Sequence, residues 1–160
     1  MRPKPTACIL SSAKDVARRT QPTLMQELAH ALSRAERGVT RQLARAMEEQ
    51  GCTVEDWRTL LLLADGRGHP MTEIAEFALV PAPSVTRLID RMVTSGLVHR
   101  TADPGDRRRV LVHLTRRGRA LQRRLDEIVE REQHALLAGA ERAEAERLLG
   151  MLGGLADRLA

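Results

Sequence analysis

The chain has 160 residues and a formal net charge of +5, and 42% of it is hydrophobic although only 1% is aromatic. This length is enough for one domain with its own core. Single-stranded nucleic acid is usually held by stacking on Phe, Tyr or Trp, so the near absence of these residues argues against such a partner. The positive charge favours a polyanion, and duplex DNA fits best, although a solvated arginine-rich surface would give the same charge.

The first 20 residues have the composition of a flexible N-terminal arm. Their only apolar run covers residues 7–10, which is too short for a signal peptide. No stretch of the chain approaches the roughly 18 apolar residues of a membrane span, so we expect a soluble cytoplasmic protein without a membrane partner. Cys8 and Cys52 lack the spacing of a metal or disulfide motif, and a reducing cytosol would keep both as thiols.

Both ends of the remaining chain have the pattern of long amphipathic helices. Between residues 23 and 49, apolar residues recur at steps of three and four. Thr23 and Gln26 have the spacing of a helix cap, and Gly51 ends the pattern. The region 116–160 predicts two further helices, the first of them capped by Thr115. Few nearby elements could cover these apolar faces, so we expect the regions 21–52 and 116–160 to form a homodimer; a monomer that packs its own helices together is the alternative.

The region 53–115 begins with two candidate helices. Thr53 and Asp56 have the spacing of a capping box, which predicts a helix up to residue 64. Thr72 is expected to cap a shorter helix over residues 73–79. Glycine-rich turn residues separate the two helices, so the chain changes direction between them.

A third helix and a hairpin complete this region. Pro83 suits the first position of a helix that runs to Ser95, because the amide hydrogen that proline lacks would have no partner there. Gly96 ends this helix. Residues 97–101 and 109–114 then predict two strands around a turn. This order predicts a mostly α fold with a small β wing, the winged helix-turn-helix, over residues 53–115.

The helix from Pro83 to Ser95 separates into an apolar and a polar face. Its expected buried residues are Val85, Leu88, Ile89, Met92 and Val93, and its expected exposed residues are Ser84, Thr86, Arg87, Asp90, Arg91 and Thr94. Arg can hold guanine through two hydrogen bonds, and Ser and Thr can bond bases or phosphates in the major groove. We therefore predict that Ser84, Thr86, Arg87 and Arg91 contact DNA. An ordinary surface helix is the alternative.

The hairpin and the residues after it are rich in arginine. Between residues 99 and 119, seven arginines accompany only two acidic residues, Asp103 and Asp106. Such a density is typical of phosphate binding, and arginines at a hairpin tip can enter a narrow minor groove. We predict a DNA-binding wing formed by Asp106, Arg107, Arg108 and Arg109. A solvated hairpin without a partner is the alternative.

The stretch from Met71 to Leu125 resembles the MarR family of bacterial transcription regulators. The motif residues that carry the resemblance are Gly96, Leu97, Val98, His99, Arg100, Asp103, Pro104, Asp106, Arg107, Arg108, Leu114, Thr115 and Gly118. The resemblance implies that Ser84, Thr86 and Arg87 read the groove. It also implies that Arg108 enters the minor groove, oriented by Asp106. It further implies a triangular dimer joined by both termini.

The resemblance implies an effector cavity near His30, Met47 and Trp57, although each of these residues is also typical of ordinary packing. Peroxide sensors of the family carry a reactive cysteine near the start of the first long helix, and Cys8 lies well before it. Cys52 precedes a helix N-terminus that could lower its pKa. The five histidines include no close pair of metal ligands, so we predict neither a metal site nor a cofactor.

These observations predict a homodimeric regulator, most simply a repressor, that binds a pseudo-palindromic operator in duplex DNA. The resemblance further implies that a small molecule releases it. The alternatives are an architectural DNA-binding protein without operator preference, a thiol-based redox sensor on the same fold, and a winged helix that binds another protein. An enzyme is not expected, because the chain contains no GxSxG, HExxH, GxxxxGK[ST] or GxGxxG motif.

Overall fold

The fold was analysed in a computed structural model, which describes residues 22–106, 108–136 and 142–159. The predicted N-terminal arm, with Cys8, lies outside the described residues, as does Arg107. In chain order the elements are α2 (Leu24–Glu48), α3 (Val54–Leu62), the short helix η1 (Leu63–Asp65), β1 (His69–Pro70), α4 (Met71–Ala78), α5 (Ala82–Thr94), β2 (Val98–Ala102), β3 (Val110–Leu114), α6 (Arg116–Leu136) and α7 (Arg142–Leu159).

The long first helix begins where the sequence predicts. The Thr23 amide donates to Oε1 of Gln26 at 2.8 Å, and the Gln26 amide donates to Oγ1 of Thr23 at 3.3 Å. These two bonds satisfy amides that have no partner inside the helix. Beyond the other end of α2, Gly51 has a φ of +63°, a conformation that glycine adopts without steric cost.

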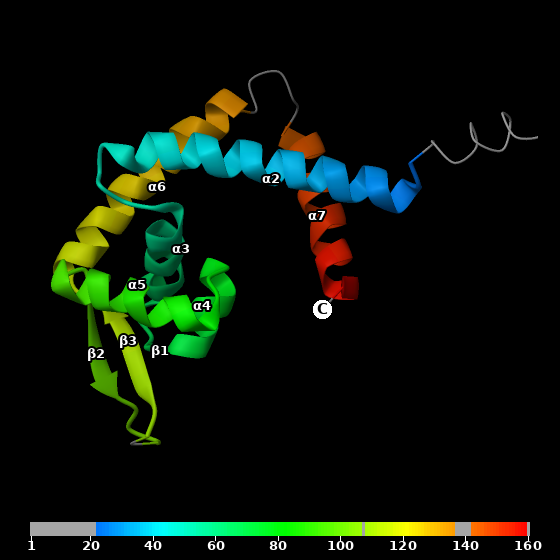
Figure 1. Cartoon of the computed structure of the whole chain (residues 1–160). Helices are drawn as coiled ribbons and strands as arrows, with labels where there is room; N and C mark the ends of the chain where they lie inside the picture. The colour runs from blue at the N-terminus through cyan, green and yellow to red at the C-terminus, as the bar shows by residue number, and fades with distance from the viewer. Residues whose placement is uncertain (1–21, 107, 137–141, 160) are drawn as a thin grey trace, which may run out of the picture. The chain divides into compact units, whose positions relative to one another are not determined.

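Helices α3, α4 and α5 and a small sheet form the winged helix-turn-helix that the sequence predicts (Figure 1). The strand order is β1-β3-β2, with β3 antiparallel to both neighbours. The hairpin of β2 and β3 extends away from α4 and α5 in Figure 1. The two-residue strand β1 was not predicted, because a pair of residues is too short to show an alternating pattern.

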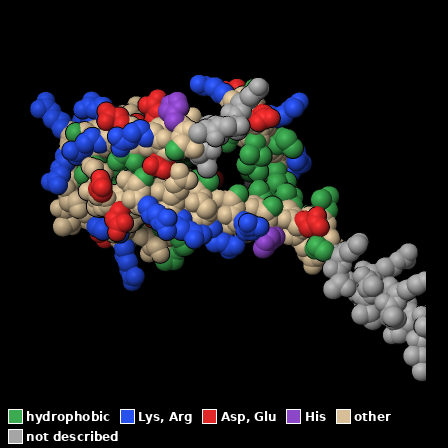
Figure 2. Space-filling view, turned by 90° about the horizontal axis from the view of Figure 1, so that it is seen from above, with side chains coloured by type: hydrophobic (Ala, Val, Ile, Leu, Met, Phe, Trp, Pro, Cys, Tyr) green, Lys and Arg blue, Asp and Glu red, His purple; other side chains and the backbone are tan. Residues whose placement is uncertain are grey.

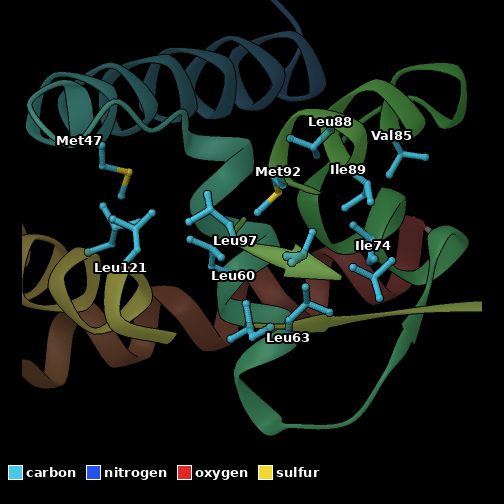
Figure 3. Close-up of a cluster of buried hydrophobic side chains, with 14 of the residues drawn as sticks. Met47, Leu60, Leu63, Ile74, Val85, Leu88, Ile89, Met92, Leu97 and Leu121 are labelled. Atoms are coloured by element: carbon cyan, nitrogen blue, oxygen red, sulfur yellow. The ribbon is translucent and has the colours of Figure 1, made fainter. Parts of the chain in front are cut away.

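The core of this domain is aliphatic, as the composition requires. Figure 3 shows side chains from α3, α4 and α5 converging with Leu97, while Met47 from the end of α2 lies near Leu121 of α6. The fully buried side chains include Met47, Leu60, Leu63, Ile74, Ile89, Met92, Val98, Val112 and Leu125. Burying each large aliphatic side chain contributes about 1.5–3 kcal/mol before the entropy cost of folding, so this cluster sets the positions of the helices.

Three details of the prediction are wrong. Thr72 does not cap α4, because the helix begins two residues earlier than predicted, at Met71, with Pro70 at the N-cap. Pro83 occupies the second helical position rather than the first, since α5 begins at Ala82. Val93 was assigned to the buried face of α5 but is 37% exposed, because it lies at the edge of the apolar stripe.

Helix α7 has no buried residue, and Figure 2 shows hydrophobic side chains uncovered along it. Leu148, Leu149, Met151 and Leu159 are all exposed. The N-terminal part of α2 likewise has exposed Leu24, Met25, Leu28 and Val39. Among the residues that the structure describes, no helix is long and apolar enough to cross a membrane.

Candidate DNA-binding surface

Helix α5 presents its polar residues to solvent, as predicted. Val85, Leu88, Ile89 and Met92 are buried, which turns Ser84, Thr86 and Arg87 outward on the first turns of the helix. The packing of the apolar stripe therefore fixes which side chains a groove could meet. Three small or cationic side chains at an exposed helix start can donate hydrogen bonds to bases and phosphates.

Arg91, also predicted to contact DNA, is held by the protein itself. Its Nη2 lies 2.7 Å from Oδ1 of Asp56, whose carboxylate is almost fully buried. The other oxygen of Asp56 accepts from the Thr53 amide at 3.0 Å and completes the capping box of α3. One carboxylate therefore caps α3 and anchors α5. The sequence predicted the cap but not the anchor.

The wing is tied to the same helix by a second ion pair. Nη2 of Arg100 on β2 lies 2.7 Å from Oδ1 of Asp90 on α5. Sequence analysis placed Asp90 on the exposed face but assigned it no partner. The pair links the base of the hairpin to α5, the two elements that are predicted to bind DNA.

The tip of the wing is shaped by two aspartates. Oδ1 of Asp103 accepts from the Gly105 amide at 2.8 Å, and Oδ1 of Asp106 accepts from the Arg108 amide at 3.0 Å. Short bonds of this type stabilise turns. Asp106 thus bonds the backbone of Arg108 and not its guanidinium, which is exposed. Arg109 is also exposed, and its amide donates to the Asp106 carbonyl at 2.8 Å.

The start of α6 packs closely on the base of the wing. Oγ1 of Thr115 accepts from the Gly118 amide at 3.0 Å, which confirms the predicted cap, and donates to the Gly96 carbonyl at 2.7 Å. A Cβ placed at Gly118 would overlap the carbonyl oxygen of Leu97. Glycine is therefore required at this position for the helix to approach the chain that leads into β2.

A buried histidine lies at the junction of β1 and α4, and sequence analysis did not assign it a role. Nδ1 of His69 lies 2.9 Å from Oε2 of Glu73, and its Nε2 lies 3.0 Å from Oδ1 of Asp65. Burial opposes a charge on the ring, but the hydrogen bonds to Glu73 and Asp65 outweigh it and raise the pKa of His69 above 6.5. Asp65 and Glu73 each lie four residues from His69 in the sequence, and this spacing is the signal that could have predicted the two contacts.

The surroundings of Cys52 do not support the alternative of a redox-active thiol. Burial raises the pKa of its thiol, the Asp56 carboxylate raises it further, and Arg124 and Arg91 only partly offset this. The pKa of Cys52 is therefore raised, whereas a helix N-terminus alone would lower it. Within the described segments, no group of three or more His, Cys, Asp or Glu residues could hold a metal ion.

The three weak effector candidates lie in different environments. Met47 is fully buried in the core cluster, and Trp57 is half-buried and packs against the same cluster. His30 is exposed on α2. Packing in the core accounts for the position of Met47 without any ligand.

Comparisons with known proteins agree with this geometry. A sequence model of the MarR family matches residues 50–109, which span α3 to the wing. The MarR-family transcriptional regulator SPO1453 from Silicibacter pomeroyi is 31% identical, with a TM-score of 0.74 over 88% of this chain and 100% of that one. The transcriptional repressor CouR, solved on a 23-mer DNA duplex, is 30% identical, with a TM-score of 0.73 over 85% of this chain and 99% of that one.

A curated relative points in the same direction. The homoprotocatechuate degradative operon repressor of Escherichia coli is 26% identical over 106 residues, which cover 66% of this chain and 72% of that protein. Winged-helix architecture, motif and relatives agree, and the chain belongs to the MarR family of DNA-binding transcriptional regulators.

Proposed function

We propose that the protein is a repressor that binds a pseudo-palindromic operator as a homodimer and is released from it by a small molecule. The observation that carries the proposal is the exposure of Ser84, Thr86 and Arg87 at the start of α5 beside a hairpin that displays Arg108. In this proposal α5 enters the major groove and the wing enters the minor groove. The related repressor CouR was solved on a DNA duplex.

The proposed homodimer would cover apolar surface that is exposed in the described part of the chain. Residues 21–52 and 116–160 are the proposed dimerisation regions, and residues 53–115 are the proposed DNA-binding domain. Exposed Leu148, Leu149 and Met151 on α7 support this assignment, as do Leu24 and Met25 on α2. Burying such side chains on association contributes about 25 cal/mol per Å² of apolar surface.

Release by a small molecule is proposed from the family and from the relatives. The repressor from Escherichia coli is named for a degradative operon. An effector can act on this chain only if it binds more tightly to the shape of the dimer that does not fit DNA. Trp57 is the best placed of the three candidates, because it is half-buried while Met47 is enclosed in the core.

Selection of duplexes from a random library by the purified protein would test the proposal. We expect an enriched two-fold symmetric sequence with half-sites about 10 base pairs apart, and a dimer in sedimentation equilibrium. If a dimer contacts about 6 to 10 phosphates, raising salt from about 50 to 200 mM should weaken binding by about 10³ to 10⁵ fold.

Two results would contradict the proposal. Equal affinity for the selected and an unrelated duplex would indicate an architectural DNA-binding protein instead. If the purified protein is a monomer and binds no duplex at low ionic strength, the proposal of a dimeric DNA-binding regulator is wrong.

A further inference from the structure

Five side chains of alternating charge run from the turn before β1 to the wing. Arg67 Nε lies 2.9 Å from Oδ2 of Asp65, and Asp65 contacts Nε2 of His69 at 3.0 Å. On its other side His69 contacts Glu73 at 2.9 Å, and Oε1 of Glu73 lies 3.7 Å from Nη2 of Arg109. We name these residues the His69 chain.

The central member of the His69 chain needs a proton to make both of its contacts. Both neighbours are carboxylates, which only accept hydrogen bonds, so a ring that serves both must donate from both nitrogens. Only the protonated imidazole does so. His69 is 8% exposed, so the two carboxylates are its main polar partners.

The sheet brings the far end of the His69 chain to the wing. His69 pairs with Val112 and Pro70 pairs with Leu111 in the antiparallel register of β1 and β3. Helix α4 begins directly after Pro70, and the 3.7 Å contact between Glu73 and Arg109 places its first turn beside the residues that lead into β3. Arg109 is the last residue before β3, and it is exposed.

We propose that Glu73 is a positioning residue for Arg109 in the wing, and that the proton on His69 decides how firmly Glu73 holds that arginine. The inference rests on the proposed function, in which Arg109 belongs to the DNA-binding wing. With His69 protonated, Glu73 is shared between two cations, and Arg109 is more easily released to a phosphate. With His69 neutral, Arg109 is the one cation that Glu73 contacts in the His69 chain, and Glu73 holds it more firmly.

Both consequences of protonation act in the same direction. A proton on His69 loosens Arg109 from Glu73, and it also adds one positive charge at the base of the wing. Each change favours a polyanion, so DNA binding takes up a proton at His69 and strengthens as the pH falls. The raised pKa of His69 places this change above pH 6.5.

The other charged or titratable groups around His69 determine the controls. Asp65 and Arg67 lie in the turn, Glu73 and Glu76 lie on α4, and the wing contributes Arg109 and His113. The pKa of Asp65 is lowered to about 2, first by its hydrogen bond to His69, so this carboxylate stays ionised throughout the relevant range. His113 stacks on His99 in the wing, with ring centroids 5.4 Å apart, so His113→Gln is the control for a histidine other than His69.

The first test needs no DNA. The pKa of His69 is measured by NMR in the free protein and in the variants Arg109→Gln, Glu73→Gln and Arg87→Gln. We expect Arg109→Gln to raise the pKa of His69, Glu73→Gln to lower it, and Arg87→Gln on α5 to leave it unchanged. An unchanged pKa in Arg109→Gln would overturn the coupling, whatever the protein does with DNA.

The second test measures binding to a duplex selected from a random library by the wild-type protein. From pH 6 to pH 9 we expect the dissociation constant of the wild type to rise by about fivefold or more. His69→Gln should lose most of this rise, and His113→Gln should keep it. Circular dichroism confirms that each variant is folded.

The outcomes separate the two proposals. A protein that binds the duplex with the same pH response in His69→Gln and wild type would overturn the inference and leave the proposed function in place. A wild-type protein that binds no duplex at any pH would overturn both.

Discussion

The Asp56 carboxylate lies 2.7 Å from the guanidinium of Arg91 and joins α3 to α5. Asp56 is almost fully buried, whereas the Arg91 side chain is 55% exposed. The same carboxylate bonds the amide and the hydroxyl of Thr53 at 3.0 and 3.1 Å. The capping of α3 and the position of α5, the helix proposed to enter the major groove, therefore both depend on the Asp56 side chain.

This double role predicts unequal effects of the two partners. Asp56→Ala removes the cap and the ion pair and should lower the free energy of unfolding by about 2–4 kcal/mol. Arg91→Ala leaves the cap intact and, because Arg91 is half exposed, should cost about 1 kcal/mol or less. Urea unfolding of both variants measures the difference. Equal losses would contradict the assignment of two roles to Asp56.

The close approach of α6 to the base of the wing predicts that Gly118→Ala is destabilising. The added Cβ would overlap the Leu97 carbonyl oxygen, so the backbone must shift at a cost of about 1–3 kcal/mol. Gly150→Ala in α7 is the matched control, since a Cβ there meets nothing within 4 Å and alanine favours a helix. Thermal unfolding compares the two. A Gly118→Ala protein as stable as the wild type would show that α6 can move away from the Leu97 carbonyl without a loss of stability.

The turn between α4 and α5 predicts an order of stability for two substitutions of Leu79. Leu79 has a φ of +57° and is 72% exposed, so it occupies a left-handed conformation and buries little surface. A side chain in this conformation costs about 1 kcal/mol. Both Leu79→Gly and Leu79→Ala remove the exposed atoms beyond Cβ, but only alanine keeps the Cβ that is unfavourable in this conformation. Leu79→Gly should therefore be more stable than Leu79→Ala. The reverse order in chemical denaturation would show that the turn relaxes when the side chain is shortened.

The surroundings of His69 predict how stability depends on pH. Its pKa is above 6.5 in the folded protein, so its contribution is complete below about pH 6.5 and is lost as the pH rises through the folded value. The gap in unfolding free energy between the wild type and His69→Gln should therefore be wide at pH 6 and narrow at pH 9. A gap that stays constant over this range would contradict a proton-dependent contribution.

The exposed start of α5 predicts a specific effect of one arginine. Arg87→Ala should reduce the discrimination between the selected and a mutated duplex by about 1–3 kcal/mol, because a two-bond contact to guanine would be lost. Arg131→Ala, exposed far along α6, removes the same charge and should leave discrimination unchanged. Competition binding assays measure both variants. Full discrimination in Arg87→Ala would remove this residue from the proposed reading surface.

Local features of the fold could be read from the sequence because each depends on residues a few positions apart. The capping box of Thr53 and Asp56, the cap at Thr115, the hairpin and the apolar stripe of α5 except Val93 all follow from spacing, and the structure confirms them. The exposure of Ser84, Thr86 and Arg87 follows from the same stripe.

Contacts between distant elements were decided only by packing. Arg91 meets Asp56, which is 35 residues away, and the wing meets α5 through Arg100 and Asp90. The exposed position of Val93 and the raised pKa of Cys52 also depend on which surfaces other elements cover. Spacing along the chain determines a helix and its faces, whereas the partner of a charged side chain and the burial of a thiol are set by the three-dimensional arrangement of helices and strands.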